Sequence, residues 1–482
     1  MNVPLFLRQA CLSACALALL SVSANAADWS YPLPDKSLAP EVSICPLLYD
    51  KTWAYSVEID DGPASTATFS ADFFAQYRFT DAPPGVPGGK SMPVVGGAAL
   101  FAYVIAANHS YLSPQTIREL LAKGWGITNH SYSHIGRSWG NPPEILTSEQ
   151  IREELYWSQS IFAHDYGEGR APTHFVYPNG YTGYAQLFGE FGLLSASHVG
   201  GPGGCNMLDE KTVLTSMPRA YLDEGPWSGK NNDTPLHQFP KDGPQPGHLQ
   251  IDFTHGNNPD PESANQKRWK ARMDHISARY GKDGDDTMWS APVQSVIHYT
   301  LARRKASVAV KDGVLKVTLP DDAPGSPLTI RLEGIPEATQ MPAPQGGALL
   351  YRKGTTVWIT TPFLGKPGTA APEPRIRRDF TGPAGTHEFA SPVQMAGVQL
   401  YHIGKPEAET EVRILLTLAD GTTQTLGPKI LKAAWGNGNL LFPVLPHRAP
   451  LSVKKIEVSS ARELKRMDVW VVGAADKPVA AK

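Results

Sequence analysis

Short apolar runs, each closed by a turn, recur over the first two thirds of the chain and predict strands. Residues 53–59 mix aromatic and β-branched residues and stop before Gly62–Pro63, a strand-breaking pair. Because Asp60 and Asp61 follow this run, we expect them at a strand's carboxyl end, where α/β folds usually build their sites. Similar runs predict further strands at 99–106, 125–128, 173–177, 193–199 and 251–253.

Helical periodicity fills the intervals between these strands. Ser113–Pro114 has the form of a helix N-cap followed by proline, and Gly124 ends that pattern. Thr147–Gln150 has the form of a capping box that opens a second helix. Strands that alternate with helices over residues 40–304 predict an α/β layout with a largely parallel sheet, open or closed into a barrel. The other expected helices lie at 69–79, 184–191, 263–280 and 290–304.

The pattern changes to short alternating strands after Lys305. Two alternating runs flank Asp312–Gly313 and predict a hairpin with a type I′ turn. Residues 365–375 have the composition of a linker, and Asp420–Gly421 marks another turn. The C-terminal part therefore predicts one or two all-β sandwich modules. The expected organisation is a domain of 27–304 that begins with an irregular arm at 27–52, a β module of 305–366 and a β-sandwich module of 367–482.

The overall composition argues against nucleic acid as a partner but does not indicate which ligand the protein binds. The 482 residues carry a formal net charge of −2, so no basic surplus favours nucleic-acid binding. The chain contains 44 glycines and 43 prolines, which fits a loop-rich protein with much β-structure better than a helical one.

Residues 1–26 have the pattern of a secretory signal peptide. Arg8 provides positive charge, residues 15–22 form a short apolar core, and Ala24–Asn25–Ala26 matches a cleavage site. This core is shorter than the ~20 residues of a membrane-spanning helix, and no later run predicts a transmembrane segment. Cys15 precedes most of the apolar core, which argues against a lipid-modified cysteine. We expect a bacterial protein exported to the periplasm or the exterior.

Two cysteines, Cys45 and Cys205, remain after that segment is removed. An exported protein with two cysteines is able to pair them. Pairing also requires that their Cα atoms lie close together, which the sequence does not show. A disulfide and two free thiols both stay open.

The strongest candidate chemistry combines Asp60 and Asp61 with His130 and His134, which follow the strand predicted at 125–128. Taken alone, Asp-Asp-Gly-Pro is ordinary turn chemistry and the two histidines are ordinary surface residues. Together, two imidazoles and one carboxylate with open positions form a catalytic zinc pattern, although another divalent first-row metal would fit. Neighbouring aspartates point in different directions, so one can bind the metal while the other accepts a proton.

His255 ends the strand predicted at 251–253. By itself it is more typical of a core or capping histidine. Opposite a metal and a carboxylate base, it would serve as a general acid toward the leaving group.

Residues 50–304 resemble the polysaccharide deacetylase superfamily, the NodB-homology carbohydrate esterases. That family's first motif, Asp-Asp-Gly-Pro after a strand, is matched by residues 60–63. Its second motif, His-Ser/Thr-x-x-His, is matched by residues 130–134, and its fifth, apolar-x-His, by residues 253–255. The resemblance implies a distorted (β/α) barrel that removes N- or O-acetyl groups from sugars with a bound divalent metal, most often Zn²⁺.

The resemblance also implies a role for each matched residue. Ser131 would brace the histidine turn by hydrogen bonding. The metal ligands would be Asp61, His130 and His134, the catalytic base Asp60 and the catalytic acid His255.

Two motifs depart from the family pattern. The third is usually Arg-x-Pro-Tyr, but Val176 stands here in place of the arginine. Pro178 matches, and Asn179 replaces the aromatic residue, although its backbone N–H could still serve an oxyanion. Arg170 or Arg219 would have to supply the missing guanidinium.

The fourth motif, aspartates followed by tryptophan, is matched only loosely by Asp223 with Trp227. Glu58 replaces the usual small polar residue before the aspartate pair. Several aromatic residues near the motifs could form platforms for sugar rings, although each is individually more typical of a core. These are Tyr132, Trp139, Tyr181, Tyr184 and Trp227.

Three hypotheses follow. The first is an exported, metal-dependent deacetylase of an N-acetylated polysaccharide or oligosaccharide. The second is a hydrolase of the same fold that cleaves another non-peptide C–N or ester bond, and the divergent third motif keeps it open. The third is a non-catalytic glycan-binding protein. The C-terminal modules could bind carbohydrate or act as spacers, and protein partners are not indicated.

Overall fold

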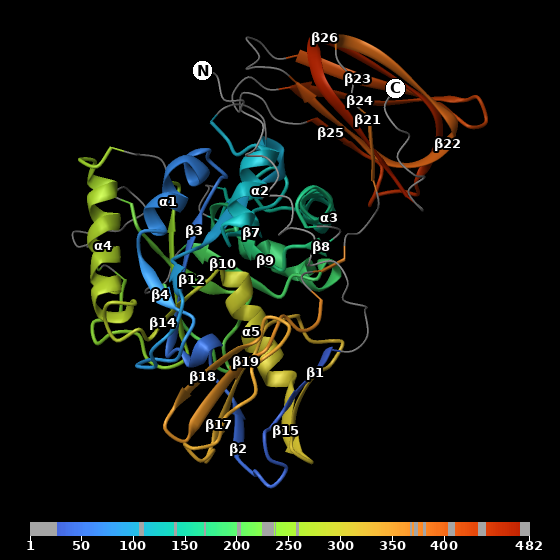
Figure 1. The fold of residues 1–482 in the computed structure, drawn as a ribbon. Coiled ribbons are helices and arrows are strands. Elements are labelled where there is room, and N and C mark those ends of the chain that lie inside the picture. The colour runs from blue at the N-terminus through green and yellow to red at the C-terminus, as the bar shows by residue number, and fades with distance from the viewer. Residues whose placement is uncertain are drawn as a thin grey trace, which may run out of the picture.

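The structure is a computed structural model with a central barrel, a small β module and a C-terminal β-sandwich (Figure 1). The segment expected to be a signal peptide, residues 1–26, lies outside the described residues. The described residues are 27–105, 110–138, 142–167, 170–199, 204–223, 236, 238–256, 260–366, 369–370, 375–378, 382–402, 410–431 and 440–472.

Seven parallel strands close into the barrel. Each strand pairs with the next, and the last pairs back with the first from Leu249↔Ala54 to Thr254↔Ile59. The predicted α/β barrel is thereby confirmed. In spatial order the strands are β3 (Trp53–Ile59), β6 (Gly97–Leu100), β7 (Gly126–Asn129), β9 (His174–Val176), β10 (Ser195–Val199), β12 (Met217–Tyr221) and β13 (His248–Thr254).

The barrel is distorted around β3, because two strands share one of its edges. β14 (Met288–Ser290) pairs with the first half of β3, and β6 pairs with its last two residues, Glu58 and Ile59. β11 (Cys205–Met207) adds to β13 in the antiparallel direction. The carboxyl end of β3, and the aspartates after it, therefore lie on the closed ring.

Helices cover the outside of the barrel (Figure 1). The predicted caps form: Ser113 and Thr147 each accept from the N3 backbone N–H of their helix. The helices are α1 (Ala71–Phe74), α2 (Pro114–Ala122), α3 (Ser148–Asp165), α4 (Ala264–Tyr280) and α5 (Val293–Lys305).

Two expected elements are shorter than predicted. The helix expected at 69–79 is a π-helical turn, Thr66–Ser70, followed by the single turn of α1. The strand expected at 99–106 ends at Leu100 and continues as a 3-10 turn, Ala102–Val104. In both places part of the apolar run packs into the core as short turns, so the periodicity overestimated the length of the predicted element. Residues Thr182–Phe191 form a 3-10 helix.

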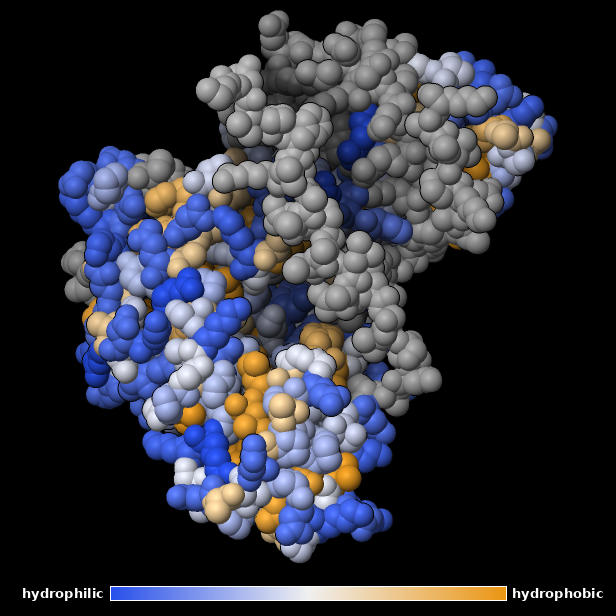
Figure 2. All heavy atoms as spheres, viewed as in Figure 1, coloured by the Kyte–Doolittle hydropathy of each residue, from blue (hydrophilic) through white to orange (hydrophobic). Residues whose placement is uncertain are grey.

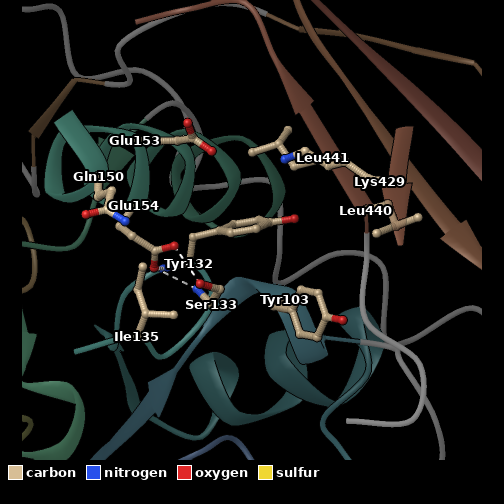
Figure 3. Close-up of a pocket in the computed structure, with 10 residues that line it drawn as sticks. All are labelled: Tyr103, Tyr132, Ser133, Ile135, Gln150, Glu153, Glu154, Lys429, Leu440 and Leu441. Atoms are coloured by element: carbon tan, nitrogen blue, oxygen red, sulfur yellow. Dashed lines mark hydrogen bonds between the residues drawn. The ribbon is translucent and has the colours of Figure 1, made fainter. Parts of the chain in front are cut away.

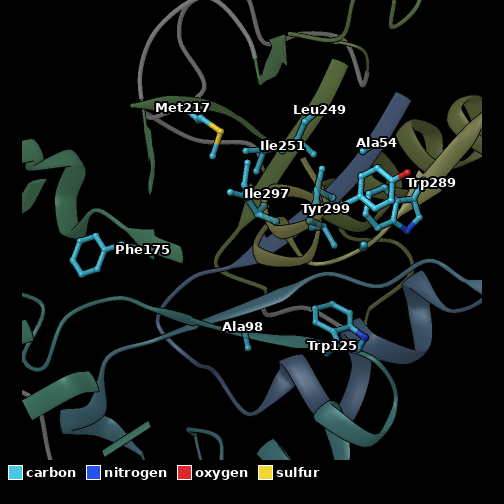
Figure 4. Close-up of a cluster of buried hydrophobic side chains, with 14 of the residues drawn as sticks. Ala54, Ala98, Trp125, Phe175, Met217, Leu249, Ile251, Trp289, Ile297 and Tyr299 are labelled. Atoms are coloured by element: carbon cyan, nitrogen blue, oxygen red, sulfur yellow. The ribbon is translucent and has the colours of Figure 1, made fainter. Parts of the chain in front are cut away.

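The core joins the inner faces of the strands to α5 (Figure 4). Ile251 of β13 and Ile297 of α5 are both fully buried there. Every side chain of β3 is buried as well, as expected of a parallel strand with both faces covered. One of these side chains is the carboxylate of Glu58, so it requires a charged partner inside the protein.

The small β module includes the chain's N-terminal residues. β1 (Ala27–Pro32) pairs with β16, and β2 (Glu41–Ile44) pairs with β17. The expectation of an irregular arm at 27–52 was wrong, because these strands find partners almost 300 positions away that local patterning does not reveal. The remaining strands are β15 (Ser307–Lys311), β16 (Val314–Leu319), β17 (Thr329–Glu333), β18 (Leu349–Lys353) and β19 (Thr356–Thr360).

The hairpin predicted within this module is present. Asp312 and Gly313 have φ values of 53° and 74°, as a type I′ turn requires. Cys45 and Cys205 are free thiols, so the disulfide that the sequence left open is not formed. Short strand pairs elsewhere join β4 (Arg78–Thr80) to β5 (Ser91–Pro93) and β8 (Arg170–Ala171) to β20 (Thr369–Ala370).

The C-terminal β-sandwich has its own hydrophobic core. Its two longest strands, β22 (Gly382–His402) and β26 (Leu451–Val471), pair along most of their length. The other strands are β21 (Arg375–Arg378), β23 (Thr410–Leu418), β24 (Thr423–Leu431) and β25 (Leu440–Pro443).

The visible surface is mainly hydrophilic, with small hydrophobic groups near the junction of the barrel and the small module (Figure 2). A cavity of about 480 Å³ lies at this junction, lined among others by Phe363 and Trp289. It also touches Val95 and Gly124, which precede β6 and β7, so it lies toward the amino ends of those strands. No helix in the described part of the chain is long and apolar enough to cross a membrane.

Candidate metal centre

Three side chains from two strand ends converge at the carboxyl end of the barrel. Asp61 follows β3, and His130 and His134 follow β7. The Oδ1 atom of Asp61 lies 3.5 Å from Nε2 of His130 and 3.4 Å from Nε2 of His134. The three candidate ligand atoms all lie within 4.8 Å of one another.

This arrangement fits a divalent metal. Zinc bound at about 2.0–2.1 Å in a tetrahedron needs ligand atoms roughly 3.3–3.4 Å apart, close to the two distances from Asp61. The donor set of two imidazoles and one carboxylate is that of a catalytic zinc site, which keeps a position open for water or substrate. Asp61, His130 and His134 are therefore the residues that would hold the metal.

The surroundings of Asp61 and His134 favour the deprotonated forms of these two ligands, whereas Asp61 and Asp60 outweigh burial and raise the pKa of His130. Burial raises the pKa of Asp61, but the neighbouring His130 and His134 outweigh burial and hold that pKa well below its usual range. Burial, followed by the neighbouring His130, lowers the pKa of His134 to about 4. A carboxylate and a neutral imidazole are the forms that bind metal.

Hydrogen bonds orient His130 for this role. Its Nδ1 lies 2.7 Å from the carbonyl oxygen of Val176. Because a carbonyl only accepts, Nδ1 must carry the proton, which leaves the Nε2 lone pair facing Asp61 and His134. Val176, where the family has arginine, thus contributes through its backbone.

The turn between the histidines is tightly braced. Ser131 has a positive φ of 70°, and its Oγ accepts from the backbone N–H of His134 at 2.9 Å. Its own N–H donates to the side chain of Asn129 at 2.7 Å. The left-handed backbone of Ser131, fixed by these two hydrogen bonds, turns the chain so that the imidazole of His134 lies beside that of His130.

Glu154, in the middle of α3, is a supporting residue that the sequence did not indicate. Its buried carboxylate accepts from the N–H of Tyr132 at 2.9 Å, and from the N–H and hydroxyl of Ser133 at 2.8 and 2.6 Å. Burial nevertheless raises its pKa above the usual value. The sequence analysis did not single out Glu154, because its contact with the histidine turn lies about 21 positions away in the chain.

Asp60 is held by an arginine on another strand. Arg219 of β12 donates from Nη1 and Nη2 to the two oxygens of Asp60 at 2.7 and 2.8 Å. The guanidinium is buried and lies 4.2 Å from the centre of the Phe253 ring. This bidentate pair fixes the position of the carboxylate beside the candidate metal ligands.

Residues 96–187 match the family model for polysaccharide deacetylase. This match supports the resemblance of the barrel to the polysaccharide deacetylase superfamily. No curated protein matches the chain. Within the deacetylase barrel, the match includes both candidate histidine ligands, and Asp60 and Asp61 precede it.

Solved structures with similar folds have low identity and low TM-scores. A Streptococcus pyogenes deacetylase, PplD, in complex with acetate is 12% identical, with a TM-score of 0.26 over 34% of this chain and 62% of that one. A Clostridium thermocellum family 4 acetyl xylan esterase with cobalt is 14% identical, with a TM-score of 0.25 over 49% of this chain and 87% of that one. A Bacillus anthracis CE4 family pseudoenzyme, BA3943, is 10% identical, with a TM-score of 0.31 over 52% of this chain and 66% of that one. The chain thus spans less than two thirds of PplD and of BA3943.

Of the two arginines that the sequence offered in place of the motif-three arginine, Arg219 is the one that contacts Asp60. Arg170, the other candidate, lies in β8 and pairs with β20. Arg219 also reaches Glu58 at 3.3 Å. The buried carboxylate of Glu58 further contacts His174 at 3.0 Å and accepts from the Ser197 hydroxyl at 2.7 Å.

Burial of Glu58 would raise its pKa, but His174, Arg219 and Ser197 outweigh burial and lower it to about 2. The residue that replaces a small polar one in the deacetylase motif is therefore a buried anion shared between a histidine and an arginine.

His255, the candidate acid of the deacetylase barrel, is half-buried directly after β13. Its ring packs edge-on against Tyr221, at 5.8 Å between ring centroids. Its backbone N–H donates to Asp223 at 3.3 Å, and Asp223 also accepts from the Trp269 indole at 2.8 Å. Trp227, the tryptophan that the sequence suggested beside Asp223, lies outside the described residues.

Pro178 and Asn179 form a 3-10 turn after β9. Asn179 has a positive φ of 50°, and its side-chain amide donates to the carbonyl of Gly136 at 3.1 Å. The Ser138 hydroxyl donates to the Asn179 carbonyl at 3.1 Å. This turn is thereby tied to the segment that follows His134.

Of the five aromatic residues suggested as sugar platforms, the structure describes the three tyrosines, and these are buried or half-buried. Tyr184 is fully buried, Tyr132 is 7% exposed and Tyr181 is half-buried. Trp139 and Trp227 lie outside the described residues. Of this set, only the tyrosines have a described place in the fold.

Proposed function

We propose that this protein is an exported, divalent-metal-dependent deacetylase of an N-acetylated polysaccharide or oligosaccharide. The observation that carries the proposal is the convergence of Asp61, His130 and His134 within 4.8 Å at the carboxyl end of a deacetylase-type barrel. Export rests on the sequence pattern of residues 1–26.

The metal proposed is Zn²⁺, although another first-row metal would suit the donor set. When bound, such an ion would lower the pKa of coordinated water and would polarise a carbonyl as a Lewis acid. Asp61, His130 and His134 would hold it, while the Val176 carbonyl and the turn around Ser131 fix the directions of the imidazoles.

Asp60 acts as the base. Each of its oxygens accepts one hydrogen bond from Arg219, and a carboxylate oxygen keeps a second lone pair for the proton of the attacking water. The fixed carboxylate avoids the cost of reorganisation at the moment of reaction. Glu58, which contacts His174 on its other side, pairs with Arg219 and helps to hold the guanidinium in place.

His255 acts as the acid and protonates the leaving amine nitrogen. Asp223 holds its backbone, and its proximity to the site is reflected in its influence on the pKa of Asp61. The backbone N–H of Asn179, preset by Pro178, is the proposed donor to the developing oxyanion.

The test measures metal content and acetate release together. The purified protein is incubated with N-acetylglucosamine oligomers beside its Asp61→Ala and His134→Ala variants, and bound metal is counted for each. We expect acetate from the unmodified protein and loss of both metal and acetate from the variants.

Other outcomes point to the remaining functions. Bound metal without acetate from any glycan, but with turnover of another ester or amide, would move the chemistry to a different bond. Glycan binding without metal or turnover would support a non-catalytic glycan-binding protein.

A further inference from the structure

The C-terminal β-sandwich is packed firmly against α3 of the barrel. Trp157 of α3 packs against Trp470 of β26, with ring centroids 5.2 Å apart, and its indole donates to the Leu445 carbonyl at 3.2 Å. Glu153 pairs with His447 at 2.6 Å. A single hydrophobic cluster includes residues of both bodies, so the position of the sandwich is set by packing.

A cavity of about 310 Å³, open to solvent on one side, lies between the two bodies (Figure 3). One wall is the histidine turn and α3, and the other is β24 and β25 of the sandwich. The lining residues Tyr132 and Ser133 lie between His130 and His134 in the chain. Since Cα atoms of neighbouring residues are about 3.8 Å apart, the Cα of Tyr132 is within about 7.6 Å of both histidine Cα atoms.

The lining is chemically mixed in a way that suits a sugar ring. Tyr103 and Tyr132 contribute aromatic rings, which pair edge-to-face with centroids 6.3 Å apart. Leu440 and Leu441 contribute apolar surface, and Gln150 contributes an amide. Aromatic and apolar surfaces contact the C–H face of a saccharide, while polar groups contact its hydroxyls.

Lys429 of β24 provides a cation in this cavity. Its side chain reaches from the sandwich toward Tyr132 (Figure 3). In the described part of the chain no carboxylate forms an ion pair with it. Burial lowers its pKa, although Glu153 and Glu154 act in the opposite direction. Its Nζ lies 6.0 Å from the centre of the Phe442 ring, a weak contact that leaves its N–H donors available to an oxygen-rich ligand.

We infer that this cavity is a saccharide subsite of the glycan chain whose acetylated residue lies at the metal centre. The site rests on the proposed function, and it assigns the sandwich a role in substrate binding. Tyr132 contacts the ring of a neighbouring sugar residue, and Lys429 donates to a hydroxyl or an acetamido carbonyl of that residue.

The experiment uses N-acetylglucosamine oligomers of two to six residues as probes. Lys429→Met removes the ammonium and keeps an apolar stem of similar length. Lys454→Met is the matched control, because Lys454 is an exposed lysine of the same sandwich. We expect Lys429→Met to raise the KM for the hexamer about tenfold, and that for the dimer much less, through loss of a hydrogen bond from a charged group. Zinc content and the unfolding midpoint verify that each variant is folded.

Direct binding separates this proposal from the deacetylase proposal. Calorimetric titration of the hexamer into Asp60→Asn protein, with and without Lys429→Met, reads the subsite without turnover. About tenfold weaker binding with the second substitution supports the subsite even where no acetate is released from any oligomer. Equal binding, no binding of the hexamer, or the same change in Lys454→Met would overturn it.

Discussion

At the scale of single residues, two buried arginines each donate two hydrogen bonds to one buried carboxylate. Arg219 donates to both oxygens of Asp60 beside the candidate metal ligands. Arg272 of α4 donates to both oxygens of Asp252 at 2.9 and 2.6 Å. Both guanidiniums are almost fully buried, so either loss leaves an uncompensated charge inside the protein.

Comparing variants of these two arginines distinguishes an effect on stability from an effect on catalysis. Arg219→Gln and Arg272→Gln should both lower the free energy of unfolding by about 3–5 kcal/mol, the cost of breaking a buried ion pair. Only Arg219→Gln should lower the kcat for acetate release from folded protein, by at least tenfold, because Asp60 loses its fixed position. Denaturant unfolding and steady-state kinetics measure the two effects. Equal kcat values for the two variants would show that Arg219 does not contribute to catalysis.

Sequence motifs located Asp61, His130 and His134, because each follows a predicted strand and parallel strands end at one face. The sequence could not decide whether Arg170 or Arg219 supplies the missing guanidinium. The answer depends on which strands lie across the barrel from β3, and local sequence patterns do not show this. Glu154 and Trp269 were also missed. Their contacts run from helices to strand ends across 21 to 46 positions, a range that no local pattern reports.

At the scale of elements, α3 supports the candidate metal centre. It carries Glu154, whose carboxylate accepts three hydrogen bonds from the histidine turn. The ends of such a helix are readable from capping boxes, as Thr147 shows. Tertiary packing decides which face of α3 contacts the histidine turn, so a capping box does not predict it.

Glu154→Gln should weaken zinc binding by about 10- to 100-fold, as expected when a supporting partner of a metal ligand is altered. The amide replaces one acceptor oxygen with a donor that opposes the N–H groups of Tyr132 and Ser133. Glu149→Gln, at the exposed start of the same helix, is the control. Competition with a chromophoric chelator gives both affinities, and equal values would show that the turn needs no help from α3.

α5 carries a titratable group in the core. His298 is 5% exposed, and its Nε2 lies 2.6 Å from the hydroxyl of Thr173. Burial lowers the pKa of His298 from 6.5 to about 4. The unfolded chain therefore binds this proton more readily than the folded protein between those pH values.

Stability should consequently fall as the pH drops from about 6.5 toward 4, by up to about 3 kcal/mol from this residue. His298→Gln removes the titration and should flatten that part of the curve. Urea unfolding at a series of pH values checks it. An unchanged slope would mean that His298 does not contribute to the acid sensitivity.

At the scale of the whole molecule, the contact between barrel and sandwich depends on a small set of large side chains. Trp157 packs against Trp470, and a Cβ added at Gly397 would lie 2.8 Å from the Trp157 ring. This glycine permits the close approach of β22 to α3.

Trp157→Ala should therefore release the sandwich from the barrel and increase the radius of gyration measured by small-angle X-ray scattering. Truncating a buried tryptophan costs about 3–5 kcal/mol. Trp289→Ala removes a comparable buried side chain away from this interface and should lower stability without changing the radius. Equal radii for the two variants would show that other contacts are sufficient to hold the sandwich.

The pairing of β1 and β2 with the small module has a consequence for how the chain is made. The Tyr31 hydroxyl donates to the carbonyl of Pro342, 311 positions later. Chains are synthesised from the N-terminus at about 5–20 residues per second, so the first strand leaves the ribosome tens of seconds before its partner. β1 and β2 are thus unable to complete their native contacts until residue 342 has been synthesised, which leaves a long interval for chaperones to act on them.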